Sequence, residues 1–396
     1  MFLMTRSEKT ESDALLLLVA GAKGAVASTV AAAIAVMQHD PAAVVPSLTT
    51  GSLFSFLGPL PATRLAGWDS AGETLPAAIE KHGVIPESLW KPHARDLDRM
   101  SILPAPAPSG DLQTQIEQLR RDITHLKSQH PRARAVLVNL LPSAACLDLR
   151  GCRNLAELYA HADSGRLPDL AYALAAVTSG LPIVNFTPNE VEIPPVLDEA
   201  VKHGAPVAGR DGKTGQTYLK VVLASALKAR HLLIDGWYSL NILGNADGAN
   251  LMDPNRAAGK LSNKTNLLDE ILGYKVGANY PAPAHKVHID YYPPRGDAKE
   301  AWDAIDIKGM FGLPMSLRVN LLGRDSILAA PLVLDLARWA AALQMAGRCG
   351  PVPELGFYFK KTVGESPPLT FQDQVTSLAR LERECHDKIT AGETVK

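Results

Sequence analysis

The chain has 396 residues, 46% of them hydrophobic, and a formal net charge of −1. This length allows two domains with large cores. The near-neutral charge gives no support for a nucleic-acid partner, because a protein that neutralises many phosphates is normally basic. The four cysteines have no metal-type spacing, which favours reduced thiols in a cytoplasmic protein.

Residues 14–37 are apolar enough to be mistaken for a signal peptide or a membrane span. Acidic residues precede this stretch, Lys23 interrupts it, and Gly21 and Gly24 punctuate it, all of which argue against a membrane partner. The pattern predicts a buried parallel strand over 15–20, a glycine-rich turn, and a helix over 26–38.

This turn departs from the dinucleotide-binding pattern G-x-G-x-x-G, because lysine and valine stand where it has its second and third glycines. A plain strand-to-helix turn therefore explains it equally well. If a dinucleotide binds, its pyrophosphate would lie at the start of the helix, where free N–H groups point outward.

Further elements alternate along the chain. The spacing predicts helices over 111–129, 169–178 and 325–342, a buried strand over 135–141 that ends beside Ser143, and strand-like runs at 231–235 and 286–292. Because ligands lie at the carboxyl ends of parallel strands in open α/β sheets, Ser143 is a candidate ligand residue.

A helix with one buried face is predicted to begin near Thr214. Its first turn, Thr214, Gly215, Gln216 and Thr217, places hydroxyl and N–H donors where the helix dipole is positive, which suits a phosphate. The alternative is an ordinary surface helix capped by threonine.

Several runs, taken together and in this order, resemble the signature runs of the myo-inositol-1-phosphate synthase family: Asn241–Asn250, Gly259–Asn266, Tyr291–Lys299, Asn320–Pro331 and Phe357–Lys360. The resemblance spans roughly residues 14–362. It implies a Rossmann-type doubly wound parallel sheet formed by 1–194 and 308–396, with an inserted α+β catalytic and tetramerisation domain at 195–307. It also implies a homotetramer.

The resemblance further implies NAD as cofactor. The positions that match its contacts are Gly21, Gly24, Ala27, Ser28, Asp69, Ser143, Asn185, Asp211, Lys213, Asn245, Asp247 and Asp325. For Asp69, which matches an aspartate that takes the adenosine ribose, another role remains open: it could simply open the helix that runs toward Glu80.

The activity that the resemblance implies is the cyclisation of a hexose 6-phosphate by oxidation at C5, enolisation, aldol closure and re-reduction. Lys260 and Lys360 would act at the C5 hydroxyl and Lys299 at the C1 oxygen. Lys264 would hold phosphate with Thr214, Gly215, Gln216 and Thr217. Cationic groups suit this chemistry, because an alkoxide and an enolate both develop negative charge.

Three residues depart from the family pattern: Phe186, Arg210 and Arg324. The two arginines replace acidic residues and are expected to shift the local charge by about four units, assuming ordinary ionisation. Glucose 6-phosphate is the leading substrate, but these departures keep open a five-membered cyclitol phosphate made from fructose 6-phosphate, and a non-catalytic NAD-binding protein is a further alternative. His285 and His288 could suggest a metal site, but alternation on a strand explains them equally well, and no metal ligand is assigned.

Overall fold

The computed structural model describes residues 15–107, 110–144, 149, 151–161, 169–253 and 267–393. One sheet has seven strands in the order β11-β6-β5-β4-β1-β2-β3, and its neighbouring strands are parallel. The strands are β1 (Leu15–Ala20), β2 (Arg64–Asp69), β3 (Ile102–Pro104), β4 (Arg134–Asn139), β5 (Ile183–Asn185), β6 (Pro206–Gly209) and β11 (Gly350–Pro351).

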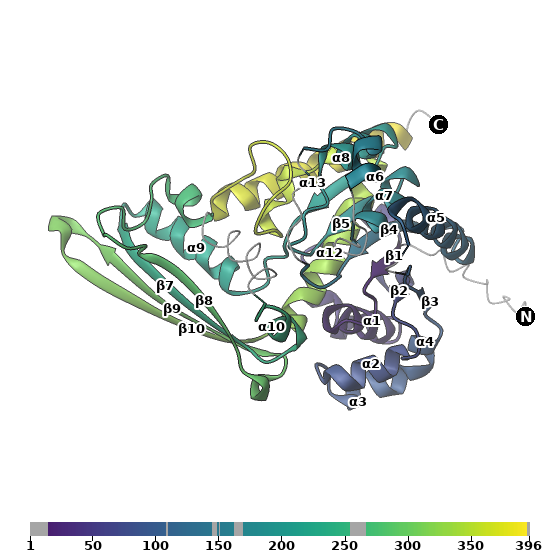
Figure 1. Ribbon diagram of the computed structural model, residues 1–396, viewed down its shortest axis with the longest axis horizontal. Helices are drawn as coiled ribbons and strands as arrows, with labels where there is room; N and C mark the ends of the chain where they lie inside the picture. Colours follow the sequence, from purple (N-terminus) through teal and green to yellow (C-terminus); the bar gives the residue numbers. More distant parts are fainter. Residues whose placement is uncertain are drawn as a thin grey trace, which may run out of the picture.

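Helices cover both faces of this sheet (Figure 1). Leu15, Leu17 and Val19 of β1 pack in a core cluster with α1 (Ala25–Met37), α12 (Asp325–Met345) and α13 (Phe371–Glu393). Leu16 and Leu18 join the opposite cluster with α5 (Leu112–Gln129), α7 (Asp169–Thr178) and α8 (Pro194–Lys202). A strand buried on both faces is apolar at every position, which explains the continuous apolar run of β1.

The shorter helices are α2 (Leu75–His82), α3 (Glu87–Trp90), α4 (Ala94–Asp98), α6 (Leu155–His161) and α10 (Ala246–Asn250). The longest helix on its face, α5, shows how the sequence fixes such elements. The Asp111 carboxylate accepts a hydrogen bond from the Thr114 amide at 2.8 Å and so caps the helix. Its apolar positions recur every three or four residues and are buried: Leu112, Ile116, Leu119, Ile123 and Leu126.

The second sheet has the strand order β10-β9-β7-β8 and extends away from the first (Figure 1). Its strands are β7 (Leu233–Leu243), β8 (His285–Tyr291), β9 (Ala298–Lys308) and β10 (Pro314–Arg324). Strand β7 runs parallel to β8 and antiparallel to β9, which is antiparallel to β10. Helix α9 (Gln216–Ala229) covers one face through a cluster that includes Val221, Trp237 and Ile305. The mixed sheet matches the predicted inserted α+β domain.

The predicted strand over 15–20 and the predicted helix over 169–178 have the same bounds in the structure. The domain boundaries stay a prediction, and sheet membership leads us to move them. Strand β6 belongs to the first sheet although it lies within 195–307, and β10 belongs to the second although it lies beyond 307. We therefore place the insertion from α9 to β10.

Helix α12 is the described helix that is long and apolar enough to cross a membrane, but 78% of its most apolar window is buried inside the protein. It packs against α1 and against strands of the parallel sheet. A core position accounts for its composition.

Candidate active site

The turn after β1 has the geometry of an anion-binding turn. Gly21 has a φ of +81°, and a Cβ there would lie 3.1 Å from the Leu140 carbonyl oxygen, so the turn requires glycine at this position. Gly24 occupies the N-cap of α1 and has no side chain with which to cap it. The first-turn N–H groups of α1 therefore suit a pyrophosphate, and this part of the fold fits a dinucleotide. Ala27 and Ser28 lie buried in the first turn of α1, where the Ser28 hydroxyl donates to the Ala25 carbonyl.

Asp69 is the last residue of β2, beside this turn. Its carboxylate accepts hydrogen bonds from the backbone N–H groups of Lys23 and Ser70, both at 2.7 Å. Helix α2 begins later, at Leu75, and Thr74 caps it. The alternative that Asp69 opens this helix is therefore wrong, and its position at the end of β2 is one where α/β dinucleotide folds hold a ribose.

A buried amide network stands at the ends of β4 and β5. The Asn185 amide group donates to the Asn189 carbonyl and to Glu192 Oε1, both at 2.8 Å. Asn139 and Asn189 both donate to Asp169 Oδ2, and burial raises the pKa of that carboxyl. Asn185 thus shapes the strand ends, and its direct contact with a cofactor stays a prediction. Sequence reasoning missed this network, because Asn139 and Asp169 belong to no recognisable motif.

The loop between β4 and α6 is linked to the second sheet's side of the molecule. The Asn250 amide donates to the Ser143 carbonyl oxygen at 2.9 Å, and Ser143 is buried. Asn245 Oδ1 accepts a hydrogen bond from the Gly248 amide and so begins α10, the short helix in which Asp247 also lies. The structure therefore brings Ser143 close to α10, and a cofactor site shared by these residues stays a prediction.

The segment after β6 carries the first ion pair of a charged cluster. Lys360 Nζ lies 2.6 Å from Asp211 Oδ1, and only 9% of the lysine side chain is exposed. The backbone holds this pair, since the Lys360 amide donates to the Asp211 carbonyl and the Lys213 amide donates to the Tyr358 carbonyl. Two segments about 150 residues apart are thus joined as a short antiparallel pair, with Gly212 opposite Phe359.

Asp325 links two further predicted site residues. Its Oδ1 accepts a hydrogen bond from Thr214 Oγ1 at 3.0 Å and lies 3.4 Å from Lys299 Nζ. Next to it, Asp297 accepts a hydrogen bond from the Ser326 hydroxyl, and burial raises the pKa of the Asp297 carboxyl. Several predicted site residues therefore lie close to the segment that leads into α9. They form two lysine–aspartate pairs, Lys360 with Asp211 and Lys299 with Asp325, and Thr214 contacts the second pair.

Helix α9 begins close to the predicted phosphate-binding turn, and phosphate binding there stays a prediction. It begins at Gln216, two residues after the predicted Thr214, with Gly215 at the N-cap. The Gln216 side chain is fixed by Asp303, because its amide donates to Asp303 Oδ2 at 3.0 Å. The other Asp303 oxygen accepts hydrogen bonds from Trp237 Nε1 and Ser239 Oγ. Sequence reasoning missed Asp303, since one acid on an amphipathic strand gives no signal of its own.

Lys213 was predicted to contact the cofactor. In the structure its side chain is buried and bonded to other parts of the protein. Only 2% of the residue is exposed, and Nζ donates to the Gly356 carbonyl and to Gln374 Oε1, both at 2.9 Å. Burial, and next the charge of Lys360, lower the pKa of Lys213 to about 7. Lys213 therefore ties the segment that carries Lys360 to α13.

Lys213 makes protein stability depend on pH. The pKa is about 7 in the folded chain and 10.5 for an ordinary lysine, so between these pH values the unfolded chain binds a proton that the folded chain lacks. The free energy of unfolding is therefore expected to rise with pH across this window. In Lys213→Met this part of the rise should vanish, as measured by urea unfolding at several pH values, and an unchanged slope would show that Lys213 is not buried as described.

The two arginines that depart from the family pattern have different partners in the structure. Arg210 lies 2.9 Å from Glu190 and 3.3 Å from Glu192, so two carboxylates neutralise it. The Arg324 guanidinium donates to the Gly83 and Val84 carbonyls beyond α2. The charge of Arg210 is therefore compensated within the fold, and the expected difference of about four charge units from the family pattern stays a prediction.

Phe186 does lie where a ring can shape the site. A Cβ on Gly212 would stand 2.1 Å from the Phe186 ring, so the ring lies against the backbone between Asp211 and Lys213. His285 and His288 both lie on β8, where Lys220 Nζ is 2.8 Å from His285 Nε2. Lys260 and Lys264 lie outside the described residues.

Comparison with known proteins adds the family. The family model described as myo-inositol-1-phosphate synthase matches residues 215–326. "Inositol-3-phosphate synthase 1" of Bacteroides thetaiotaomicron is 39% identical over 266 residues, which cover 65% of this chain and 61% of that protein. The human protein of the same name is 31% identical over 72% of this chain and 55% of its own length. The match thus spans about three fifths of these relatives.

Solved structures share the fold over nearly the whole chain. Inositol-3-phosphate synthase from Caenorhabditis elegans has a TM-score of 0.80 at 20% identity and covers 94% of this chain and 86% of its own. A myo-inositol-1-phosphate synthase-related protein from Thermotoga maritima has a TM-score of 0.76 at 20% identity, covering 94% and 98%. These structures show the fold, while the family model and the curated relatives place the chain in the myo-inositol-1-phosphate synthase family.

Proposed function

We propose that this chain uses NAD to cyclise a hexose 6-phosphate to a cyclitol phosphate, with glucose 6-phosphate and myo-inositol phosphate as the leading pair. The observation that carries the proposal is that the short segment before α9 contacts both lysine–aspartate pairs. Asp211 pairs with Lys360, and Thr214 donates to Asp325, which pairs with Lys299. A regulator that merely bound NAD would need neither pair. We also propose a cytoplasmic location.

The cofactor fits the ends of β1 and β2, where Gly21 and Gly24 form the turn and the carboxylate of Asp69 stands beside it. When bound, NAD supplies reversible oxidation of an alcohol carbon, so the reaction has no net redox change. The chain's own part is to position the sugar phosphate and to move protons. A closed site between two domains also keeps water from the intermediates.

Lysines move protons and stabilise the negatively charged oxygens that form during the reaction. Lys360, with Lys260, holds the oxygen at C5. Beside a carbonyl at C5 the C6 protons are acidic, and the base is a neutral lysine or the substrate phosphate. The C6 carbon then attacks the C1 aldehyde, a C6–C1 bond forms, and the C1 oxygen gains the negative charge that Lys299 stabilises before it is protonated.

The N-terminal turn of α9, with Lys264, would hold the substrate phosphate. Thr217→Val removes one hydroxyl from a buried position while keeping the side-chain shape. A hydrogen bond to a charged group contributes about 1.5–3 kcal/mol, so KM for the sugar phosphate should rise about tenfold to a hundredfold, with NAD affinity unchanged. Steady-state kinetics and NAD titration measure both, with Thr124→Val on α5 as the control. Equal effects on substrate and NAD would contradict a phosphate cradle.

Phe186 favours a second candidate substrate. Its ring lies over Gly212, next to the Asp211–Lys360 pair, and a bulkier wall suits a smaller carbocycle. Fructose 6-phosphate closed to a five-membered cyclitol phosphate is therefore the alternative.

The test is to incubate the purified protein with NAD and each sugar phosphate separately, and to identify the product by NMR. An inositol phosphate from glucose 6-phosphate supports the leading proposal. A five-membered cyclitol phosphate from fructose 6-phosphate supports the alternative. Bound NAD with no product from either sugar contradicts both and favours a non-catalytic NAD-binding protein.

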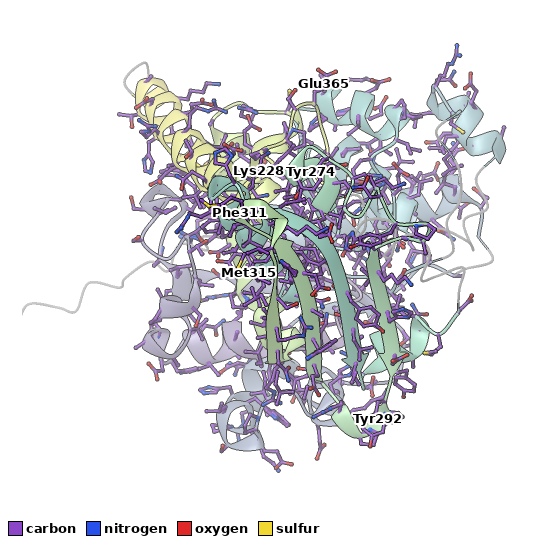
Figure 2. The ribbon with its side chains drawn as sticks, turned by 90° about the vertical axis from the view of Figure 1, so that its left-hand side faces the viewer. Lys228, Tyr274, Tyr292, Phe311, Met315 and Glu365 are labelled. Atoms are coloured by element: carbon purple, nitrogen blue, oxygen red, sulfur yellow. The ribbon has the colours of Figure 1, made fainter. Side chains whose placement is uncertain are left out.

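The open face of the second sheet supports the homotetramer. Figure 2 views this sheet, with Phe311 and Met315 near one end and Tyr292 at the other. Strand alternation puts Tyr238, Trp302 and Leu322 on the face away from the α9 cluster, and 63% of Leu322 is exposed. Aromatic and aliphatic residues on an open sheet face suit a second copy of the same chain.

Leu322→Glu is expected to break this assembly, because a buried unpaired charge opposes association. Light scattering after size-exclusion chromatography should show a smaller species. Leu89→Glu, on α3 and similarly exposed, is the matched control and should leave the mass unchanged. An unchanged mass for Leu322→Glu would contradict assembly through this face.

A further inference from the structure

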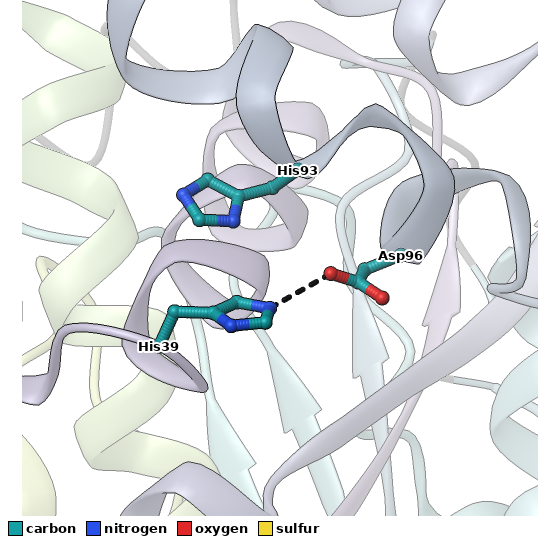
Figure 3. Close-up of side chains that lie close together, drawn as sticks. All are labelled: His39, His93 and Asp96. Atoms are coloured by element: carbon teal, nitrogen blue, oxygen red, sulfur yellow. Dashed lines mark hydrogen bonds and ion pairs between the residues drawn. The ribbon is translucent and has the colours of Figure 1, made fainter.

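A cluster of metal-ligand side chains lies away from the site described above. It consists of His39, just after α1, His93, in the short turn Lys91–His93, and Asp96, in α4. One potential ligand atom from each lies within 4.8 Å of the others. Figure 3 shows the two imidazoles and the carboxylate converging.

The residues are already arranged toward one another. His39 Nε2 lies 2.9 Å from Asp96 Oδ2, and the rings of His39 and His93 stack with centroids 4.8 Å apart. His93 and Asp96 are three residues apart at the start of a helix, which puts them on the same side.

We propose that His39, His93 and Asp96 form a binding site for a divalent transition-metal ion, best matched by zinc. Imidazole nitrogen and carboxylate oxygen are both zinc ligands, and three protein ligands leave a fourth position for water. This inference does not depend on the proposed cyclisation, because none of the three residues belongs to that site.

The site needs a contraction and a rotation of one ring, because the stacked rings of His39 and His93 direct their lone pairs side by side. With Zn–N and Zn–O distances of about 2.0–2.2 Å, tetrahedral donors stand about 3.4 Å apart, so the widest separation must shrink by roughly 1.4 Å. The His39 side chain is 55% exposed and can rotate to achieve this. Asp96 is oriented from its other side, since Arg99 Nη1 lies 3.3 Å from Asp96 Oδ1. Such an outer hydrogen bond orients a metal ligand.

The site would cross-link two parts of the nucleotide-binding half. Helix α1 runs from the turn that suits a pyrophosphate to His39, while His93 and Asp96 belong to the segment that follows α3. An ion that binds the folded chain and not the unfolded one raises the melting temperature. Zinc is therefore expected to raise Tm by a few degrees, a shift that each histidine substitution should remove.

The test uses the untagged protein and zinc chloride alone, with binding measured by isothermal titration calorimetry and Tm measured with and without zinc. The wild type should bind one equivalent, and His39→Ala and His93→Ala should each weaken binding at least about tenfold. His125→Ala, on α5, and Cys349→Ser, an exposed cysteine, are controls that should bind like the wild type. Because the substituted side chains lie near the surface, an unchanged Tm without zinc will show that the variants fold.

Two results would overturn the proposal. One is the absence of one-to-one binding by the wild type. The other is zinc binding that survives in both His39→Ala and His93→Ala, which would place the ion elsewhere. A Tm that rises equally with zinc in the wild type and in both variants would likewise show that the ion binds elsewhere.

Discussion

Lys360→Met is expected to lower turnover of the sugar phosphate about a hundredfold to a thousandfold, as for the loss of one preorganised donor to a developing oxyanion. The Lys360 ammonium lies 2.6 Å from Asp211 Oδ1 and is largely buried. Methionine keeps the length of the apolar stem but removes the charge. The variant also leaves the Asp211 carboxylate without this cation, so turnover must be measured beside thermal unfolding.

Lys361→Met is the matched control, because Lys361 is adjacent in sequence but exposed. Its turnover should stay within about twofold of the wild type, as is usual for an exposed side chain outside a site. Lys360→Met should still bind NAD, because Lys360 is not itself a predicted NAD contact and the turn formed by Gly21 and Gly24 is unchanged. Full turnover in folded Lys360→Met would remove this residue from the mechanism.

Lys299→Met should have the second large effect, a loss of cyclisation of about a thousandfold. Its ammonium lies 3.4 Å from Asp325 Oδ1, and the lysine and aspartate side chains are 15% and 19% exposed. Thr214 still donates to the same Asp325 oxygen, so the carboxylate keeps one partner and the fold should persist. Product formation followed by NMR measures the loss.

Lys308→Met provides the comparison for Lys299, since both lysines lie on β9 and Lys308 also pairs with an aspartate, Asp235, at 2.9 Å. That pair lies at the far end of the strand and should not affect turnover. Equal losses in both variants would indicate damage to the strand rather than to chemistry at C1.

Much of the fold could be predicted because local patterns agree with it. The continuous apolar run at 15–20 correctly predicted a strand that is buried on both faces. The apolar residues at every third or fourth position in 111–129 correctly predicted a helix that is buried on one face. The assignment of β6 and β10 to their sheets could not be predicted in this way. Sheet membership of β6 and β10 depends on pairing between distant segments, which no local pattern encodes.

In the candidate site, too, residues within sequence motifs could be predicted, whereas contacts between distant segments could not. The positions of Asp211, Lys299, Asp325 and Lys360 were predicted from motif runs, and the structure brings them together. The buried state of Lys213 was not predicted, because it depends on Gln374, which is 161 residues away in the chain. The neutralisation of Arg210 was missed for a similar reason, since its partners Glu190 and Glu192 follow a different strand.

The central claim is that this site removes one proton from C6 of a hexose 6-phosphate and joins C6 to C1. The most direct test supplies glucose 6-phosphate with deuterium at both C6 positions, together with NAD, and measures deuterium in the product by mass spectrometry and NMR. The proposal predicts a cyclitol phosphate that keeps one of the two deuterium atoms, at the carbon derived from C6. A product that keeps both deuterium atoms would contradict it.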